Sequence, residues 1–163
     1  MKIYWIDEFD QGRLGSMPRP KGDHALAGEI DFLMAEGVDL VVSFLELAEA
    51  KLLGLGQEGR LCLERNIDFV SYPIQDYGVP DSAASYLKLC SFLLDKIKEG
   101  KRVVVHCHGG IGRSSVVAAG VLMKSGCEMD QVFELISGYR EHTVPDTAEQ
   151  TEWVYAVFNE SDD

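Results

Sequence analysis

Apolar runs alternate with amphipathic segments along this chain, and their lengths predict strands that alternate with helices. Short apolar runs at residues 38–44, 67–74 and 101–106 are typical of strands. The third run contains three consecutive valines, as expected of a parallel strand that is buried on both faces. Residues 2–6 and 13–17 lie on either side of an Asp-Gln-Gly turn and predict a short antiparallel pair.

The segments between the strands carry apolar residues at helical spacing. Helices are predicted over residues 25–36, 46–53, 57–66, 82–99, 115–123, 130–140 and 147–159. This alternation predicts one α/β domain over residues 1–163, with a central, mostly parallel, twisted sheet of about five strands and helices on both faces. Ligands in such folds bind beyond the carboxyl ends of the strands.

The composition is that of an ordered globular protein, with 46% hydrophobic and 26% charged residues among 163. No apolar run approaches the length of a membrane span, and four cysteines without a secretory leader predict a cytoplasmic protein. The formal net charge of −12 argues against nucleic acid and anionic membranes as partners. The sequence leaves the oligomeric state open.

Residues 106–114 (HCHGGIGRS) join the valine strand to an apolar helix through a glycine-rich turn. Backbone N–H groups of such a turn, together with the helix N-terminus, favour binding of a phosphate or another oxyanion. Cys107 is a candidate nucleophile, because the N–H dipoles and a nearby cation favour the thiolate. Arg113 can hold two phosphate oxygens at once. No metal site is expected, because consecutive strand residues such as His106 and Cys107 point to opposite faces.

The pattern from His106 and Cys107 through Gly110 to Arg113 and Ser114 resembles the signature loop of cysteine-dependent protein tyrosine and dual-specificity phosphatases. The resemblance implies a phosphocysteine on Cys107 and a phosphate held by Arg113 and by backbone N–H groups. It also implies that Ser114 hydrogen-bonds the departing thiolate and that His106 orders the loop. The expected substrate-binding residues are His108, Gly109, Gly110, Ile111, Gly112 and Arg113.

A leaving oxygen also requires a proton donor. Residues 73–80 (PIQDYGVP) resemble the general-acid loop of the small prokaryotic and kinase-associated branch of these phosphatases, which implies that Asp76 is the acid and later the base. Asp81 is the competing candidate, although Asp81 or Ser82 can instead cap the following helix.

Further residues are predicted to support the site. Glu46 and Glu49 follow a strand, and one of them, for which we choose Glu46, is expected to pair with Arg113; the alternative is that both are ordinary carboxylates at a helix N-terminus. Residues 144–150 resemble a phosphatase segment with two glutamines, the first of which positions water. Asp146 occupies the first place and Gln150 the second.

We therefore expect a cofactor-free phosphomonoester hydrolase for phosphotyrosine, with phosphoserine and phosphothreonine left open, whose substrate is a phosphoprotein or an aryl phosphate. The loop offers one fixed cation and no lysine, which favours simple phosphomonoesters over polyphosphorylated lipids. The alternatives are a catalytically silent phosphate-binding module and thiolate chemistry of the arsenate reductase or sulfurtransferase type. The other cysteines are interpreted as small buried hydrophobes: Cys62, Cys90 and Cys127.

Overall fold

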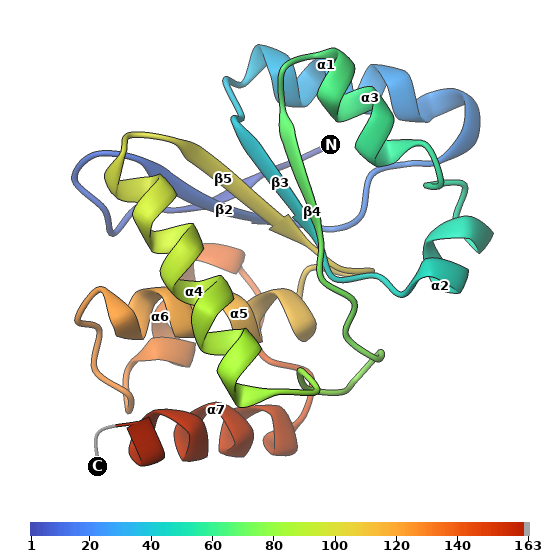
Figure 1. Cartoon of the computed structure of the whole chain (residues 1–163). Helices are drawn as coiled ribbons and strands as arrows, with labels where there is room; N and C mark the ends of the chain where they lie inside the picture. Colours follow the sequence, from blue (N-terminus) through green and yellow to red (C-terminus); the bar gives the residue numbers. More distant parts are fainter. Residues whose placement is uncertain (162–163) are drawn as a thin grey trace.

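A computed structural model describes residues 1–161 and places a five-stranded sheet at the centre of the molecule (Figure 1). The strand order is β1-β2-β5-β3-β4, and β1 alone runs antiparallel to its neighbour. The predicted α/β fold is therefore confirmed. The strands are β1 (Tyr4–Ile6), β2 (Arg13–Met17), β3 (Leu40–Ser43), β4 (Asp68–Ser71) and β5 (Arg102–His106).

Helices cover both faces of this sheet (Figure 1). One face carries a 3₁₀ turn, η1 (Asp23–Ala25), followed by α1 (Leu26–Ala35), and also α3 (Glu58–Glu64), while the short α2 (Leu47–Leu52) stands near the carboxyl end of β3. The other face carries α4 (Ala83–Lys98), α5 (Arg113–Lys124), α6 (Val132–Arg140) and α7 (Ala148–Ser161). No helix within residues 1–161 has the length and apolarity that a membrane crossing demands.

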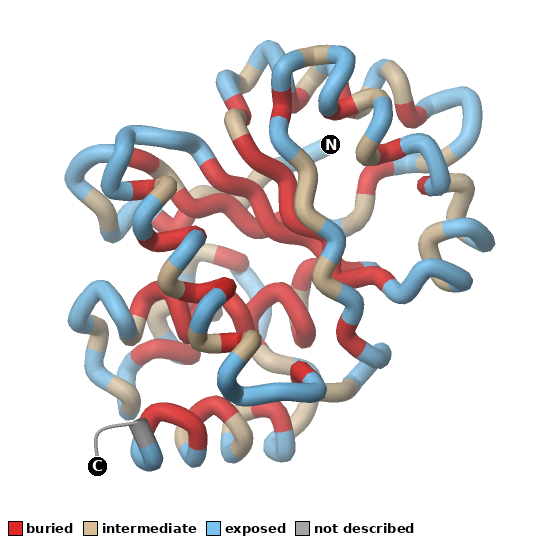
Figure 2. Tube along the Cα trace, viewed as in Figure 1, coloured by how far each residue is buried: buried red, intermediate tan, exposed pale blue. Residues whose placement is uncertain are grey.

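The central strand β5 is buried by both layers, as the valine run predicted. Val103, Val104 and Val105 are fully buried, and their side chains alternate between the two hydrophobic cores of the molecule. Figure 2 shows the same arrangement, with the buried strands enclosed between helices whose outer surfaces are exposed. Because β5 pairs with both β2 and β3, the segments that follow these three strands meet at one edge.

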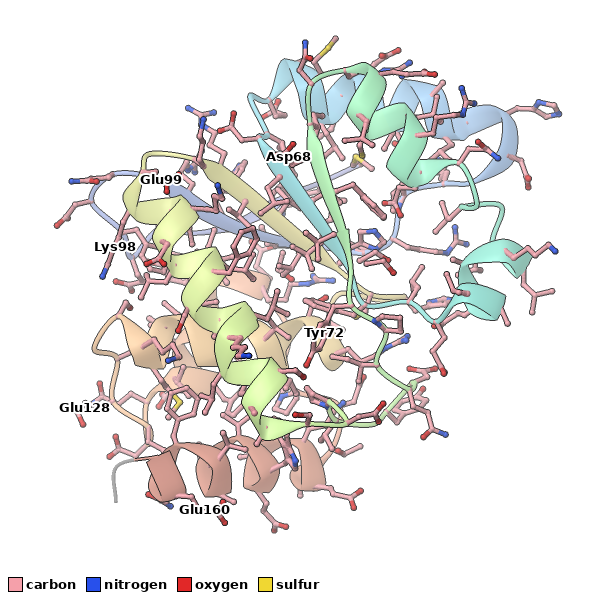
Figure 3. The ribbon with its side chains drawn as sticks, viewed as in Figure 1. Asp68, Tyr72, Lys98, Glu99, Glu128 and Glu160 are labelled. Carbon is pink, nitrogen blue, oxygen red and sulfur yellow. The ribbon has the colours of Figure 1, made fainter. Side chains whose placement is uncertain are left out.

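The strand β4 is shorter than predicted, and it ends at Ser71 instead of Ile74. Beyond Ser71 the regular ladder ends, because the next two N–H groups that face β3 bond to carbonyls of consecutive residues, whereas a parallel ladder uses every second carbonyl. The chain still runs beside the end of β3, because the N–H groups of Tyr72 and Ile74 donate to the carbonyls of Ser43 and Phe44, both at 2.9 Å. The Tyr72 side chain reaches α4, where its hydroxyl lies 2.6 Å from Ser85 Oγ (Figure 3).

Two glycines in helices should respond in opposite ways to replacement by alanine. A Cβ on Gly120 in α5 would overlap Cys90 Sγ and Tyr86 Oη of α4, whereas a Cβ on Gly28 in α1 would meet nothing within 4 Å. Gly120→Ala should destabilise the fold by about 1–3 kcal/mol through overpacking, which outweighs the gain in helix propensity of about 1 kcal/mol. Gly28→Ala should stabilise it by about 0.5–1 kcal/mol.

Thermal unfolding of the two variants beside the parent chain measures both effects. A fall in melting temperature for Gly120→Ala and a rise for Gly28→Ala are expected. An unchanged or raised value for Gly120→Ala would show that α4 and α5 can separate without loss.

Candidate active site

The glycine-rich turn connects β5 to α5 at the carboxyl edge of the sheet and forms one wall of a pocket of about 340 Å³. Cys107 is 3% exposed, and its sulfur accepts a hydrogen bond from the N–H of Gly110 at 3.3 Å. The pocket is lined by Asp76, Tyr77, Cys107, His108, Gly109, Ile111, Arg113 and Asp146. Of the predicted substrate-binding residues, Gly110 and Gly112 contribute to the turn but not to this lining.

Four successive carbonyls of the turn are held by donors outside the pocket. The Cys107 oxygen lies 3.1 Å from His106 Nδ1, and the His108 oxygen accepts from the N–H of Arg19 at 3.0 Å. Arg140 donates to the oxygens of Gly109 (2.7 Å) and Gly110 (3.1 Å). In a planar trans peptide the C=O and the following N–H point in opposite directions. The N–H groups of residues 108–111 therefore point away from these donors, as an oxyanion site requires.

Gly110 and Gly112 are required for different reasons. Gly110 has φ +73°, and a Cβ there would lie 2.6 Å from the carbonyl oxygen of Met17, so only glycine fits. Gly112 has an ordinary φ, but a Cβ would overlap the carboxylate of Asp146 and lie 3.1 Å from Gln150 Nε2. The second glycine therefore admits the start of α7 to the edge of the pocket.

Arg113 is fixed by a carboxylate and by backbone carbonyls. Its guanidinium is 1% exposed and donates to both oxygens of Glu49, at 2.7 and 2.9 Å, and to the Ile74 carbonyl at 3.0 Å. The hydrogen bonds from Arg113 hold the pKa of Glu49 below its ordinary value. Burial acts to lower the pKa of Arg113. The hydrogen bonds to Glu49 and the nearby charges of Cys107 and Asp76 outweigh burial, so the pKa of Arg113 lies above its ordinary value.

The partner of Arg113 is thus Glu49, which corrects the choice of Glu46 as the supporting carboxylate. Glu46 occupies the N-cap of α2, and its backbone N–H donates to Glu49 Oε1 at 3.3 Å. A capping box places the third helical residue against the N-cap backbone, so Glu49 faces back from the first turn and reaches Arg113. Glu46 supports the site only by orienting Glu49.

Asp76 lies in the pocket, and Asp81 is not among its lining residues. Asp76 Oδ1 is 3.3 Å from Arg113 Nη2 and accepts the N–H of Tyr77 at 3.0 Å, while half of its side chain is exposed. The cap of α4 is Ser82, whose Oγ accepts the N–H of Ser85 at 3.1 Å. Asp76 is therefore the aspartate of this loop whose position suits proton transfer.

Gln150 anchors the loop that carries Asp76. Its side chain is fully buried; Oε1 accepts the N–H groups of Asp146 (3.0 Å) and Thr147 (3.2 Å), and Nε2 donates to the carbonyl of Gly78 at 3.0 Å. Gln150 thus does not line the pocket, and it joins the start of α7 to residues 75–80. Asp146 does line the pocket, and burial together with the negative charge of Asp76 raises its pKa.

Ser114 is fully buried in the first turn of α5, and its hydroxyl has no hydrogen-bond partner within the described part of the chain. It is therefore free to donate to a thiolate, as the signature implies. Of the other three cysteines, Cys62 and Cys90 are buried as predicted, whereas Cys127 is only partly buried. Burial raises the pKa of Cys62 and of Cys90 to about 12, and burial followed by the acidic neighbours Glu8 and Glu128 raises that of Cys127.

The sequence did not reveal two of the groups that shape this site. Arg140 binds two loop carbonyls and stacks on the ring of Tyr4, with its guanidinium carbon 4.0 Å from the ring centroid. Glu58 lies behind the loop, where its Oε2 is 2.7 Å from His106 Nε2. Arg140 and the loop are 30 residues apart and Glu58 and His106 are 48 apart, so no local pattern joins them.

The family model and the viral relative that match this chain are both named as phosphatases. Residues 15–127 match the family model described as "Polymorphic toxin system, DSP-PTPase phosphatase". The putative tyrosine phosphatase 197R of Invertebrate iridescent virus 6 is 27% identical over 133 residues, which are 76% of this chain and 45% of the viral protein. The chain thus spans less than half the length of this curated relative.

Two solved structures share the fold over nearly the whole chain. A kinase-associated phosphatase with its catalytic cysteine replaced by serine superposes with a TM-score of 0.89 at 21% identity, over 98% of this chain and 95% of the other. Tk-PTP in its active form superposes with a TM-score of 0.74 at 26% identity, over 97% and 94% of the two chains.

Replacement of Gln150 tests whether this residue holds the loop that carries Asp76. Gln150→Glu keeps an acceptor for the N–H groups of Asp146 and Thr147 but turns a carboxylate toward the Gly78 carbonyl. The loop should shift, and kcat for an aryl phosphate should fall by about tenfold, since small misplacements of reacting groups are costly. Steady-state kinetics beside the exposed control Glu149→Gln measure this effect. An unchanged kcat would show that Gln150 does not hold the loop.

Proposed function

Because the chain belongs to the polymorphic toxin system DSP-PTPase phosphatase family, we propose that it hydrolyses phosphomonoesters of phosphotyrosine through a phosphocysteine intermediate. The observation that carries this proposal is the convergence of Cys107, Arg113 and Asp76 on one pocket. These are a nucleophile, a fixed cation and a proton donor, and they come from two loops at the same edge of the sheet.

In the first step, the thiolate of Cys107 attacks phosphorus in line and the P–O bond to the leaving group breaks. The N–H groups of the turn and the guanidinium of Arg113 hold the nonbridging oxygens and offset their charge. Asp76, which must carry a proton at this stage, gives it to the leaving oxygen.

In the second step, Asp76 is a carboxylate and takes a proton from water, which attacks the phosphocysteine and releases inorganic phosphate. The departing sulfur is stabilised by the hydroxyl of Ser114 and by the N–H of Gly110, which already contacts it. Asp146 stands where the phosphatase resemblance places a water-positioning glutamine, and its carboxylate accepts a hydrogen bond from the attacking water.

The substrate class follows from the walls of the pocket. Tyr77 and Ile111 supply an aromatic and an aliphatic side chain at the lining, which suit the ring of phosphotyrosine or another aryl phosphate. Arg113 is the one lysine or arginine among the lining residues and is already paired with Glu49. Polyphosphorylated ligands therefore lack the cations they require.

The assignment of the acid is tested by leaving-group dependence. Asp76→Asn should slow hydrolysis of phenyl phosphate by about 100-fold or more but that of p-nitrophenyl phosphate far less, since a good leaving group needs no proton. Asp81→Asn is the matched control and should behave as the parent. Cys107→Ser should abolish turnover, and a phosphate trapped on Cys107 by rapid quench should be seen in the parent. A selective loss of phenyl phosphate hydrolysis in Asp81→Asn instead of Asp76→Asn would reverse the assignment.

The raised pKa of Asp146 predicts a pH dependence of substrate binding. Asp146 keeps its proton to a higher pH than an ordinary aspartate, and once it loses that proton the pocket gains a negative charge beside Asp76 and the phosphate. KM should therefore rise as the pH increases through this titration, by a few-fold because the site is open to solvent. Asp146→Asn should remove the rise.

The measurement compares KM of the parent, Asp146→Asn and the exposed control Glu149→Gln at matched pH values, so that ionisation of the substrate cancels. Equal KM values for the parent and Asp146→Asn at the alkaline end would contradict this role.

A further inference from the structure

A buried pair of titratable side chains lies directly behind the active-site turn. His106, the last residue of β5, is fully buried, and Glu58, the first residue of α3, is 2% exposed. His106 Nε2 lies 2.7 Å from Glu58 Oε2, and His106 Nδ1 lies 3.1 Å from the carbonyl oxygen of Cys107. One imidazole thus connects a carboxyl group of α3 to the backbone of the nucleophile.

Hydrogen-bond chemistry fixes where the protons of this pair lie. A carbonyl oxygen only accepts, so Nδ1 must carry the proton that it donates to Cys107. The second bond then holds one proton between Nε2 and Glu58, as an imidazolium with a carboxylate or as a neutral imidazole with a carboxylic acid. In both states the ring has a hydrogen bond at each nitrogen, so Glu58 fixes the ring orientation in which Nδ1 faces the Cys107 oxygen.

The bond from Nδ1 has a direct effect on the turn. The Cys107 carbonyl is the first of the four held by outside donors, and its position aims the N–H of His108 in the opposite direction. A rotated first peptide would remove one N–H donor from the phosphate site and shift the peptides that follow.

We propose that Glu58 is a positioning residue of the active site, which acts on the phosphate-binding turn by holding His106 as a donor to the Cys107 carbonyl. This role rests on the proposed function for its effect on turnover. Its effect on the hydrogen bonds of the His106 ring and on binding of inorganic phosphate can be measured without catalysis.

A purely structural role predicts different behaviour. Buried ionic pairs give little net stability, and well-packed apolar replacements are often tolerated. If Glu58 served packing alone, an apolar side chain of similar length would leave the turn intact. The proposal instead requires a group at residue 58 that bonds Nε2.

The test compares Glu58→Gln, Glu58→Met and the control Glu64→Met in the full chain. The amide of Glu58→Gln can still bond Nε2 and so keeps the ring in place, whereas methionine leaves Nε2 without a partner in a buried site. Glu64 lies at the other end of α3, where it pairs with Arg60 on the surface, so its replacement controls for loss of a helical carboxylate.

Three measurements are made on each variant: the ¹⁵N and ¹H correlations of the His106 ring, the affinity for inorganic phosphate by calorimetry, and kcat/KM for an aryl phosphate. Glu58→Gln should keep Nδ1–H and stay within about threefold of the parent in affinity and kcat/KM. Glu58→Met should loosen the Nδ1–H bond to Cys107, seen as faster exchange of that proton with solvent, and should bind phosphate more weakly. It should lose about tenfold or more in kcat/KM, since outright removal of an oxyanion donor costs roughly 100- to 1,000-fold. Glu64→Met should match the parent.

Parental behaviour of Glu58→Met would overturn the proposal, as would an equal loss in Glu58→Gln or the absence of Nδ1–H in the parent. If Glu58→Met does not fold, Glu58→Asp, whose shorter carboxylate withdraws from Nε2, should show the same loss of phosphate affinity. A parent that binds phosphate but does not turn over, with binding still weakened in Glu58→Met, would refute the hydrolase and leave the positioning role in place.

Discussion

The site depends on one constraint: the carbonyls of residues 107–110 must all face outward so that the N–H groups that follow them face the pocket. Donors from different parts of the chain enforce it, namely the ring of His106 at the end of β5, the N–H of Arg19 after β2, and the side chain of Arg140 on α6. Gly110 alone of the turn residues has a positive φ, and it lies against the backbone of Met17. Donors outside the turn therefore hold it in shape, and its glycines allow the backbone to adopt that shape.

Electrostatics around Arg113 complete the arrangement in a strongly acidic protein. The guanidinium is neutralised on one side by Glu49 and lies beside Asp76 on the other, while Asp146 brings a further carboxyl group to the pocket. Each proton on these carboxyl groups lessens their repulsion of a phosphate. The mechanism proposed above also needs a protonated Asp76 in its first step, so in that mechanism binding and the first step favour the same protonation state.

The sequence predicted what local patterns encode. Three consecutive valines marked the central strand, and the spacing of Cys107 and Arg113 required a tight turn between strand and helix. The end of β4 was misplaced because the apolar pattern continues to Ile74, although the regular pairing with β3 ends at Ser71. Glu46 and Glu49 could not be separated, since the choice depends on which side of the first turn of α2 faces Arg113, and Arg113 is 64 residues from Glu49 along the chain. Arg140 and Glu58 were missed because their partners are backbone carbonyls and a histidine that only the folded sheet brings near.

The contribution of residues 140–150 has a consequence for synthesis of the protein. The family model ends at residue 127, beyond Cys107 and Asp76, but Arg140 and Gln150 lie further along the chain. A chain emerging from the ribosome therefore carries the whole signature turn before it carries the groups that hold the turn and the Asp76 loop in place. The positions of these two segments are therefore fixed only after α6 and α7 have docked on the rest of the domain.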